Sequence, residues 1–148
     1  MRELLGVVAD GPVHDHSEYA HHLPGLARAA QALEDDDLIA RLAGGFPDVV
    51  PRQQHVLVVV LAIQAERAGE HTRAAALYAD AADRWERFTD AIEQAHALLG
   101  QGRCLTALRD PGADVPLRRA RAVFDGMGAR RRIAECDALI TRASRLTS

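Results

Sequence analysis

Residues 51 to 87, PRQQHVLVVVLAIQAERAGEHTRAAALYADAADRWER, decide the fold of this chain. The run from Val56 to Ile63 is apolar at every position, and a short apolar run is compatible with a strand as well as with a helix. Three features favour a helix: Pro51 suits a first helical turn, Gln and Glu residues flank the run, and Gly69 stands where a helix would end. Because the run is apolar on nearly every side, we expect this helix to be buried.

A second helix is predicted after the turn at Gly69. Its apolar residues recur at helical spacing along one face, and they are Ala74, Leu77, Tyr78, Ala81 and Trp85. The small side chains of Ala74 and Ala81 are expected to lie where one helix backbone passes another, whereas Ala79 is expected to face away from that crossing. Residues 51 to 87 therefore form a predicted helical hairpin.

Helical spacing continues on the N-terminal side of this hairpin. Residues 1 to 9 predict a short helix. Asp15 and Glu18 have the spacing of a capping box, which indicates a helix start there. The apolar positions from 23 to 33 predict a longer helix, with Pro24 at a break or in a fresh first turn. An acidic turn separates the latter from a short helix that begins near Leu38 and ends at Gly44.

Three further helices are predicted on the C-terminal side. Asp90 and Glu93 have the spacing of a capping box, which marks a helix start. The apolar face of that helix is predicted to comprise Ile92, Ala95, Leu98, Leu99, Gly102, Leu105 and Leu108. The next two inner faces are predicted to be Leu117, Ala120, Val123, Phe124 and Met127, and then Ile133, Cys136, Leu139, Ile140 and Ala143.

The composition agrees with an all-α protein. The chain has 148 residues, enough for one domain with a core. Hydrophobic residues make up 48% of it but aromatic residues only 4%, and 28 residues are Ala. With so few large side chains, the core must be built by close approach of thin helices.

A repeat underlies these helices. The large-small pair Leu26-Ala27 recurs as Leu61-Ala62, 35 residues later, and again as Gln101-Gly102, a further 40 on. The first spacing is close to the roughly 34 residues of a tetratricopeptide repeat. The middle copy resembles that pattern at several positions, namely Leu61, Ala62, Gly69, Ala74, Tyr78 and Ala81, and departs from it at Val58 and Ala65.

This resemblance implies antiparallel helical hairpins, about 7 to 8 helices in all, stacked in a right-handed superhelix. The expected units of the single domain are a helix fragment and loop in residues 1–22, repeats in 23–50, 51–87 and 88–128, and a capping helix in 129–148. Residues 23 to 146 further resemble the C-terminal helical region of bacterial signalling ATPases, including nucleotide-cyclase-linked and LuxR-type regulators of actinobacteria.

The resemblance implies a non-enzymatic scaffold for signalling or transcription regulation, which binds a protein or peptide in a concave groove. The residues expected on the solvent side of the groove-lining helices are Arg28, Gln31, Glu66, Arg67, Arg103 and Thr106. The family pattern carries no catalytic residue and implies no cofactor. The sequence also contains no GxSxG, HExxH or phosphate-loop motif.

Two alternative functions remain open. Residues 101 to 148 carry 10 Arg against 5 acidic residues, while the whole chain has a net charge of −3, and a basic segment of this kind can bind nucleic acid. The arginines that would do so are Arg118, Arg119, Arg121, Arg130, Arg131 and Arg132. Pairing of the last three with acids such as Asp125 is the preferred interpretation. The second alternative is self-association, a homodimer formed through the apolar residues near Leu4 and Val8.

The histidines His14, His16, His21 and His22 are numerous enough for a metal site but lack a helical ligand spacing, so an exposed loop is favoured. His96, on a predicted helix, is interpreted as a structural histidine.

Cys104 and Cys136 are expected to be buried free thiols. No run of the sequence approaches the roughly 20 apolar residues that a membrane span needs. A cytoplasmic protein that does not enter a membrane is predicted.

Overall fold

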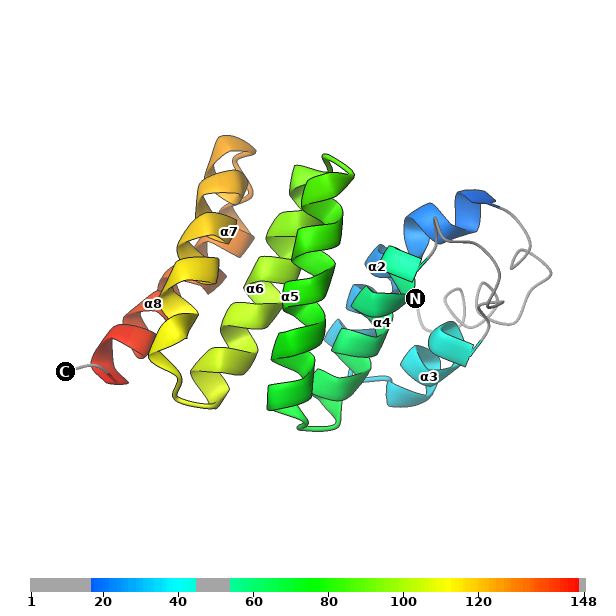
Figure 1. Ribbon diagram of the computed structural model, residues 1–148, viewed down its shortest axis with the longest axis horizontal. Helices are drawn as coiled ribbons and strands as arrows, with labels where there is room; N and C mark the ends of the chain where they lie inside the picture. Colours follow the sequence, from blue (N-terminus) through cyan, green and yellow to red (C-terminus); the bar gives the residue numbers. More distant parts are fainter. Residues whose placement is uncertain (1–16, 45–53, 147–148) are drawn as a thin grey trace.

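The computed structural model describes residues 17–44 and 54–146, and within these ranges the protein is helical throughout, with no strand. The helices stand side by side in a row, from α2 and α3 at one end to α8 at the other (Figure 1). Their bounds are Ser17–Ala32 (α2), Asp36–Gly44 (α3), Gln54–Arg67 (α4), His71–Arg87 (α5), Ala91–Ala107 (α6), Asp114–Gly126 (α7) and Arg130–Leu146 (α8), with a 3-10 turn, η3, at Pro111–Ala113. The predicted all-α class is confirmed.

Helix α4 lies in the interior because it packs against α2, α3, α5 and α6. A helix with neighbours on several sides needs apolar residues around most of its circumference. This explains the uninterrupted run in the sequence, of which Val56, Val59, Val60 and Ile63 are buried. The assignment of this Val-rich segment to a helix is therefore confirmed.

The predicted face of α5 is also confirmed in its main positions. Ala74, Tyr78, Ala81 and Trp85 are buried, while Leu77 is only half-buried. Ala74 and Ala81 have no exposed surface, as expected of small residues at a close helix contact.

The small member of each repeated large-small pair is buried in all three copies, at Ala27, Ala62 and Gly102. The reason is clearest at Gly102, where a Cβ atom would lie 2.3 Å from Cδ2 of Leu117 on α7. A Cβ at Gly100 would likewise lie 2.5 Å from the ring of Tyr78 on α5. Helix α6 therefore uses glycine to admit a large side chain from each of its two neighbours.

Five helices, α2 and α4 to α7, end in the same way. Each is followed by a residue with positive φ, and these residues are Glu34, Gly69, Thr89, Arg109 and Gly128. The next N–H donates to the carbonyl five residues earlier, as from Glu70 to Ala65, so each end is a Schellman motif. At the start of α6 the Asp90 side chain accepts a hydrogen bond from the Glu93 N–H, which confirms the predicted cap.

Several sequence-based boundaries and faces are wrong. Helix α2 begins at Ser17, close to the start that the spacing of Asp15 and Glu18 predicts, but it continues through Pro24, so the predicted break or fresh first turn at Pro24 is wrong. Proline removes one helical hydrogen bond, but here its ring is buried next to Leu23. Ile92, Leu108 and Met127 were predicted to face inward and are 45%, 43% and 50% exposed. All three lie at or just beyond a helix end, where fewer neighbouring helices cover a side chain.

Helix α8 has few buried residues. Of its five predicted inward residues only Cys136 and Ala143 are buried, while Ile133, Leu139 and Ile140 are partly buried. The helix packs on α7, with smaller contacts to α6 and η3. The predicted helix at residues 1–9 and the loop before α4 lie outside the described residues.

Candidate binding groove

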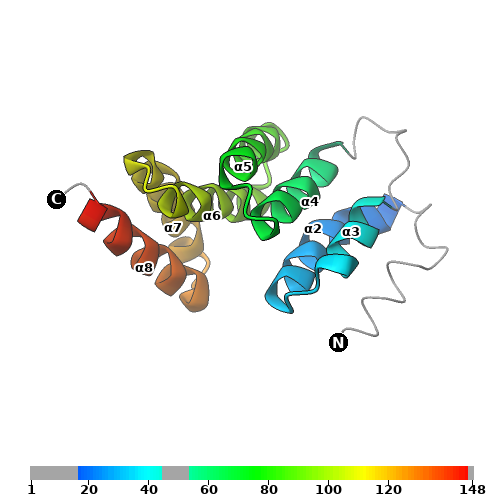
Figure 2. The same cartoon turned by 90° about the horizontal axis from the view of Figure 1, so that it is seen from below.

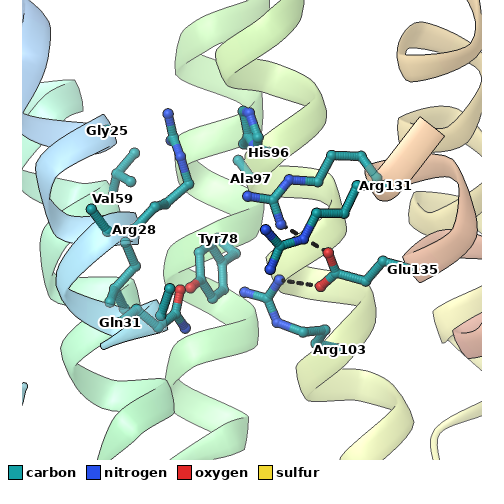
Figure 3. Close-up of a pocket in the computed structure, with 14 residues that line it drawn as sticks. Gly25, Arg28, Gln31, Val59, Tyr78, His96, Ala97, Arg103, Arg131 and Glu135 are labelled. Carbon is teal, nitrogen blue, oxygen red and sulfur yellow. Dashed lines mark hydrogen bonds and ion pairs between the residues drawn. The ribbon is translucent and has the colours of Figure 1, made fainter. Parts of the chain in front are cut away.

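A groove of about 680 Å³ is lined by residues of α2, α4, α6 and α8, with Tyr78 reaching it from α5. These four are alternate helices of the row, and α2 and α8 stand on either side of α4 and α6 (Figure 2). The close-up shows basic side chains on both sides of the opening, with the Tyr78 ring between them (Figure 3). We refer to this hollow as the groove.

Glu66 on α4 is the centre of the polar network beside the groove. Its Oε2 atom accepts hydrogen bonds from Gln31 Nε2 at 2.8 Å, Tyr78 OH at 2.6 Å and Arg103 Nη2 at 3.0 Å. Its Oε1 atom accepts from Arg103 Nε at 2.7 Å. One carboxylate thus connects side chains from α2, α5 and α6, and it holds Arg103 in a two-point contact.

The charges in this network are fixed. Burial alone would raise the pKa of the Glu66 carboxyl, but the hydrogen bonds and positive charge of Arg103, with the hydrogen bonds from Tyr78 and Gln31, bring that pKa below its usual value. The pKa of Tyr78 is raised well above its usual value by burial and by the Glu66 charge. Glu66 is therefore ionised and Tyr78 protonated over the whole physiological range.

Two further carboxylates join helices across the groove. Glu93, on α6, accepts from Nη1 and Nη2 of Arg28, on α2, each at 2.8 Å. Glu135, on α8, accepts from Arg103 Nη1 at 3.2 Å and from Arg132 Nη1 at 2.8 Å, as drawn in Figure 3. Ion pairs thus tie α6 to both sides of the groove.

His96, on α6, lies among these arginines. Burial and the positive charges of Arg28, Arg132 and Arg103 lower its pKa to about 3. Its ring meets Phe124 edge-on, with the centroids 5.1 Å apart. The imidazole is therefore neutral at physiological pH, in surroundings that already carry excess positive charge.

The predicted partner-facing residues do not all meet at one place. Arg28, Gln31 and Arg103 line the groove, and Glu66 binds two of them. Arg67 lies instead beside a smaller hollow of about 230 Å³ and pairs with Asp36 at 2.8 Å.

The expectation that Thr106 faces solvent is wrong. Thr106 is 5% exposed, and its hydroxyl donates to the Gly102 carbonyl of its own helix at 2.8 Å. Its position in the repeat corresponds to those of Gln31 and Glu66, but in α6 this position is covered. Thr106 is therefore part of the interior.

Sequence reasoning missed several groove residues: Tyr78, His96, Arg131, Arg132 and Glu135. The sequence predicts only structural roles for Tyr78 and His96. For the Arg130–132 triplet, the predicted pairing with Asp125 is wrong for Arg132, which pairs with Glu135 one turn further along α8. The position of the triplet at the start of a helix, where positive charge opposes the helix dipole, was the signal.

Three other arginines of the C-terminal third are not among the residues that line the groove. Arg118 pairs with Asp114, Arg121 pairs with Asp137 at 2.6 Å, and Arg119 lies 3.6 Å from Glu86. With Arg132, which pairs with Glu135, four of the six arginines proposed for the nucleic-acid alternative are thus matched by carboxylates of the chain.

Within residues 17–44 and 54–146, no three His, Cys, Asp or Glu side chains are placed to hold a metal ion. His14 and His16 lie outside these ranges, and His22 is exposed.

The two cysteines have raised pKa values. Burial, and after it the charge of Glu66, raises the pKa of Cys104 to about 12. Burial and nearby carboxylates raise the pKa of Cys136 to about 11. Both cysteines are free, and both thiols are protonated at neutral pH.

Comparison of the chain with models of known families, with curated proteins and with solved structures finds no match. Among the described helices, none has the length and apolar character to cross a membrane.

Proposed function

We propose that this protein is a non-enzymatic interaction module whose partner places a peptide segment in the groove. The observation that supports the proposal is that alternate helices, α2, α4, α6 and α8, share one hollow face. A volume of about 680 Å³ falls in the range of about 300 to 1,000 Å³ typical of binding pockets. Ion pairs that connect three of these helices make the face pre-formed, which lowers the entropic cost of binding.

The proposal includes a tetratricopeptide-like stacking of the helix pairs α2–α3, α4–α5 and α6–α7, with α8 after the last pair, in a right-handed superhelix. The buried small residues Ala27, Ala62 and Gly102 support this stacking, because they recur once in each pair. By the sequence resemblance, the module belongs to a bacterial signalling or transcription regulator and works in the cytoplasm.

A groove-filling substitution tests the proposal. Ala32 is exposed and lines the groove at the end of α2, so Ala32→Trp fills the hollow without entering the core. Ala40 is exposed on α3, outside the groove lining, so Ala40→Trp is the matched control. Partner capture from the native cell should be lost with Ala32→Trp and kept with Ala40→Trp. Equal capture by the two variants would refute the groove as the binding site.

Arg103→Ala is a poor test of binding, because Arg103 holds the Glu66 carboxylate. Removing one partner of a largely buried pair costs about 3 to 5 kcal/mol, and the Glu66 and Arg103 side chains are only 13% and 25% exposed. The variant is expected to lose stability, so weaker capture by it would not report on the groove surface.

A further inference from the structure

We infer that the partner segment is anionic and that Arg131 and Arg132 bind its carboxylate or phosphate group in the groove. This inference rests on the proposed function and specifies the chemistry of the segment. It follows from three independent features of the groove: its balance of charge, its balance of hydrogen-bond donors and acceptors, and the position of its arginines on α8.

The charge balance favours an anion. Four guanidinium groups lie on the groove, those of Arg28, Arg103, Arg131 and Arg132. Three of these groups, those of Arg28, Arg103 and Arg132, pair with carboxylates. The carboxylates are those of Glu66, Glu93 and Glu135. Because His96 is neutral, the cluster keeps one positive charge in excess. A segment with one carboxylate would neutralise that excess, and one phosphate group, with a charge of about −1.5 to −2 at pH 7, would more than neutralise it.

The hydrogen-bond balance gives the same answer. Both oxygens of Glu66, of Glu93 and of Glu135 already accept hydrogen bonds from groove side chains. An arginine carries five N–H donors, yet Arg132 uses one nitrogen, and the Arg131 side chain has no ion pair or hydrogen bond with any described residue. The groove therefore offers unused donors, and a matching ligand must supply acceptors.

The location of these donors is unfavourable without a ligand. Arg131 and Arg132 lie in the first turn of α8, where positive charge opposes the helix dipole. An anion bound there would interact favourably with both guanidinium groups and with the dipole. Figure 3 shows Arg131 on the α8 side of the groove, opposite Arg28 and Gln31 of α2.

A peptide fits this site better than a nucleic acid does. Binding along a phosphate backbone needs a continuous row of free cations. Here the cations alternate with carboxylates, and Arg118, Arg119 and Arg121 are paired outside the groove. One or two anionic side chains of a peptide match the unused donors without placing further phosphates beside Glu93 and Glu135.

The test compares adjacent arginines. Arg130 and Arg131 are both exposed, but only Arg131 lines the groove. The probes are a synthetic oligo-Glu peptide, an oligo-Gln peptide of equal length, a peptide with one phosphoserine, and a single-stranded oligonucleotide, each titrated at physiological ionic strength. The Glu or phosphoserine peptide should bind more tightly than the Gln peptide. Arg131→Gln should weaken that binding about tenfold, the loss of one charge-assisted contact, and Arg130→Gln by less than about twofold.

The two anionic peptides distinguish carboxylate from phosphate as the preferred group, and binding of either supports the inference. Thermal melts should show both variants to be as stable as the unsubstituted protein or slightly more stable, because neither side chain has a described partner and each substitution removes a positive charge that opposes the helix dipole. Equal binding of Glu and Gln peptides, or equal loss in the two variants, would overturn the anionic assignment. If the anionic assignment failed in one of these ways while Ala32→Trp still abolished partner capture, the proposed function would stand and only the proposed chemistry of the segment would be wrong. Preferential binding of the oligonucleotide would also overturn the inference.

Discussion

Substitution of Gly102 by Ala should destabilise the protein, although the same change in an open helix position stabilises. Gly102 lies inside α6, and a Cβ there would meet Leu117 at 2.3 and 2.4 Å. Leu117 is completely buried, so it cannot move away freely. Overpacking of this kind costs about 1 to 3 kcal/mol, whereas replacing a helical glycine by alanine contributes about 1 kcal/mol of stability. With contacts this short, the net loss should be about 1 to 2 kcal/mol.

Gly25 provides the matched control. It lies inside α2, and a Cβ there would meet no atom within 4 Å. Gly25→Ala should therefore raise the free energy of unfolding by about 0.5 to 1 kcal/mol. Both variants can be compared by urea unfolding, followed by circular dichroism and by the fluorescence of Trp85.

A double substitution tests the assigned contact. Leu117→Ala alone should cost about 2 to 5 kcal/mol, but it also removes the atoms that collide with the new Cβ. The free-energy losses of Gly102→Ala and Leu117→Ala should therefore fail to add, with a coupling of about 1 kcal/mol or more. If Gly102→Ala were as stabilising as Gly25→Ala, or if the two losses simply added, the close approach of α6 and α7 would be wrong.

Three further results are expected. Thr89→Gly should stabilise by about 0.5 to 1 kcal/mol in urea unfolding, because Thr89 has a φ of 56° that glycine adopts without strain; a loss of stability would contradict this. Ala74→Leu and Ala81→Leu should each cost about 1 to 3 kcal/mol in thermal melts, while Ala76→Leu, at an exposed position, should be nearly neutral; equal damage by all three would mean a wrong helical register. Because the pKa of His96 is about 3 when folded and near 6.5 when unfolded, the unfolded chain binds the extra proton between these values. The free energy of unfolding should therefore fall as pH drops below about 6.5, and His96 should contribute at most about 1.4 kcal/mol per pH unit to this fall. The slope of unfolding free energy against pH, measured by urea unfolding, should be smaller in His96→Gln. Identical slopes in the two proteins would contradict the assigned burial of His96.

The helices could be predicted because their signals are local. Gly69 ends α4 with a positive φ, and Asp90 caps α6 through a hydrogen bond within one turn. The spacing of Asp15 and Glu18 indicated the start of α2, but the continuation of this helix through Pro24 was missed because proline normally opens or breaks a helix. Only the burial of Pro24 in the folded chain accounts for its position inside a helix. That burial depends on neighbours that periodicity does not reveal. Ala79, predicted to face outward, is half-buried for the same reason.

The groove could be predicted only in part. Arg28, Gln31 and Arg103 were found because the repeat places them on the same side of successive first helices. Thr106 has an equivalent repeat position, but α6 also packs against η3 and α8, and the Thr106 hydroxyl bonds to its own helix. Periodicity gives a residue's side of its helix, whereas its burial depends on which elements pack there.

The ion pairs were the least predictable feature. Arg28 and Glu93 are 65 residues apart, and Arg103 and Glu66 are 37 apart. Many arginines and acids in this sequence have similar local surroundings, so spacing cannot select between them. Arg132 is the exception, because Glu135 lies three residues further along the same helix, at a spacing that favours pairing.

Mapping a bound acidic peptide onto the arginines tests the central claim most directly. The oligo-Glu or phosphoserine peptide can be titrated into isotope-labelled protein at neutral pH while NMR follows the arginine Nε–Hε groups and the histidine rings. The resonances of Arg131, Arg132 and His96 should shift and saturate together, while those of Arg118 and Arg130 stay in place. Shifts at the α7 arginines without shifts in the groove, or no saturable shift with any anionic peptide, would contradict the claim that the groove binds an anionic segment.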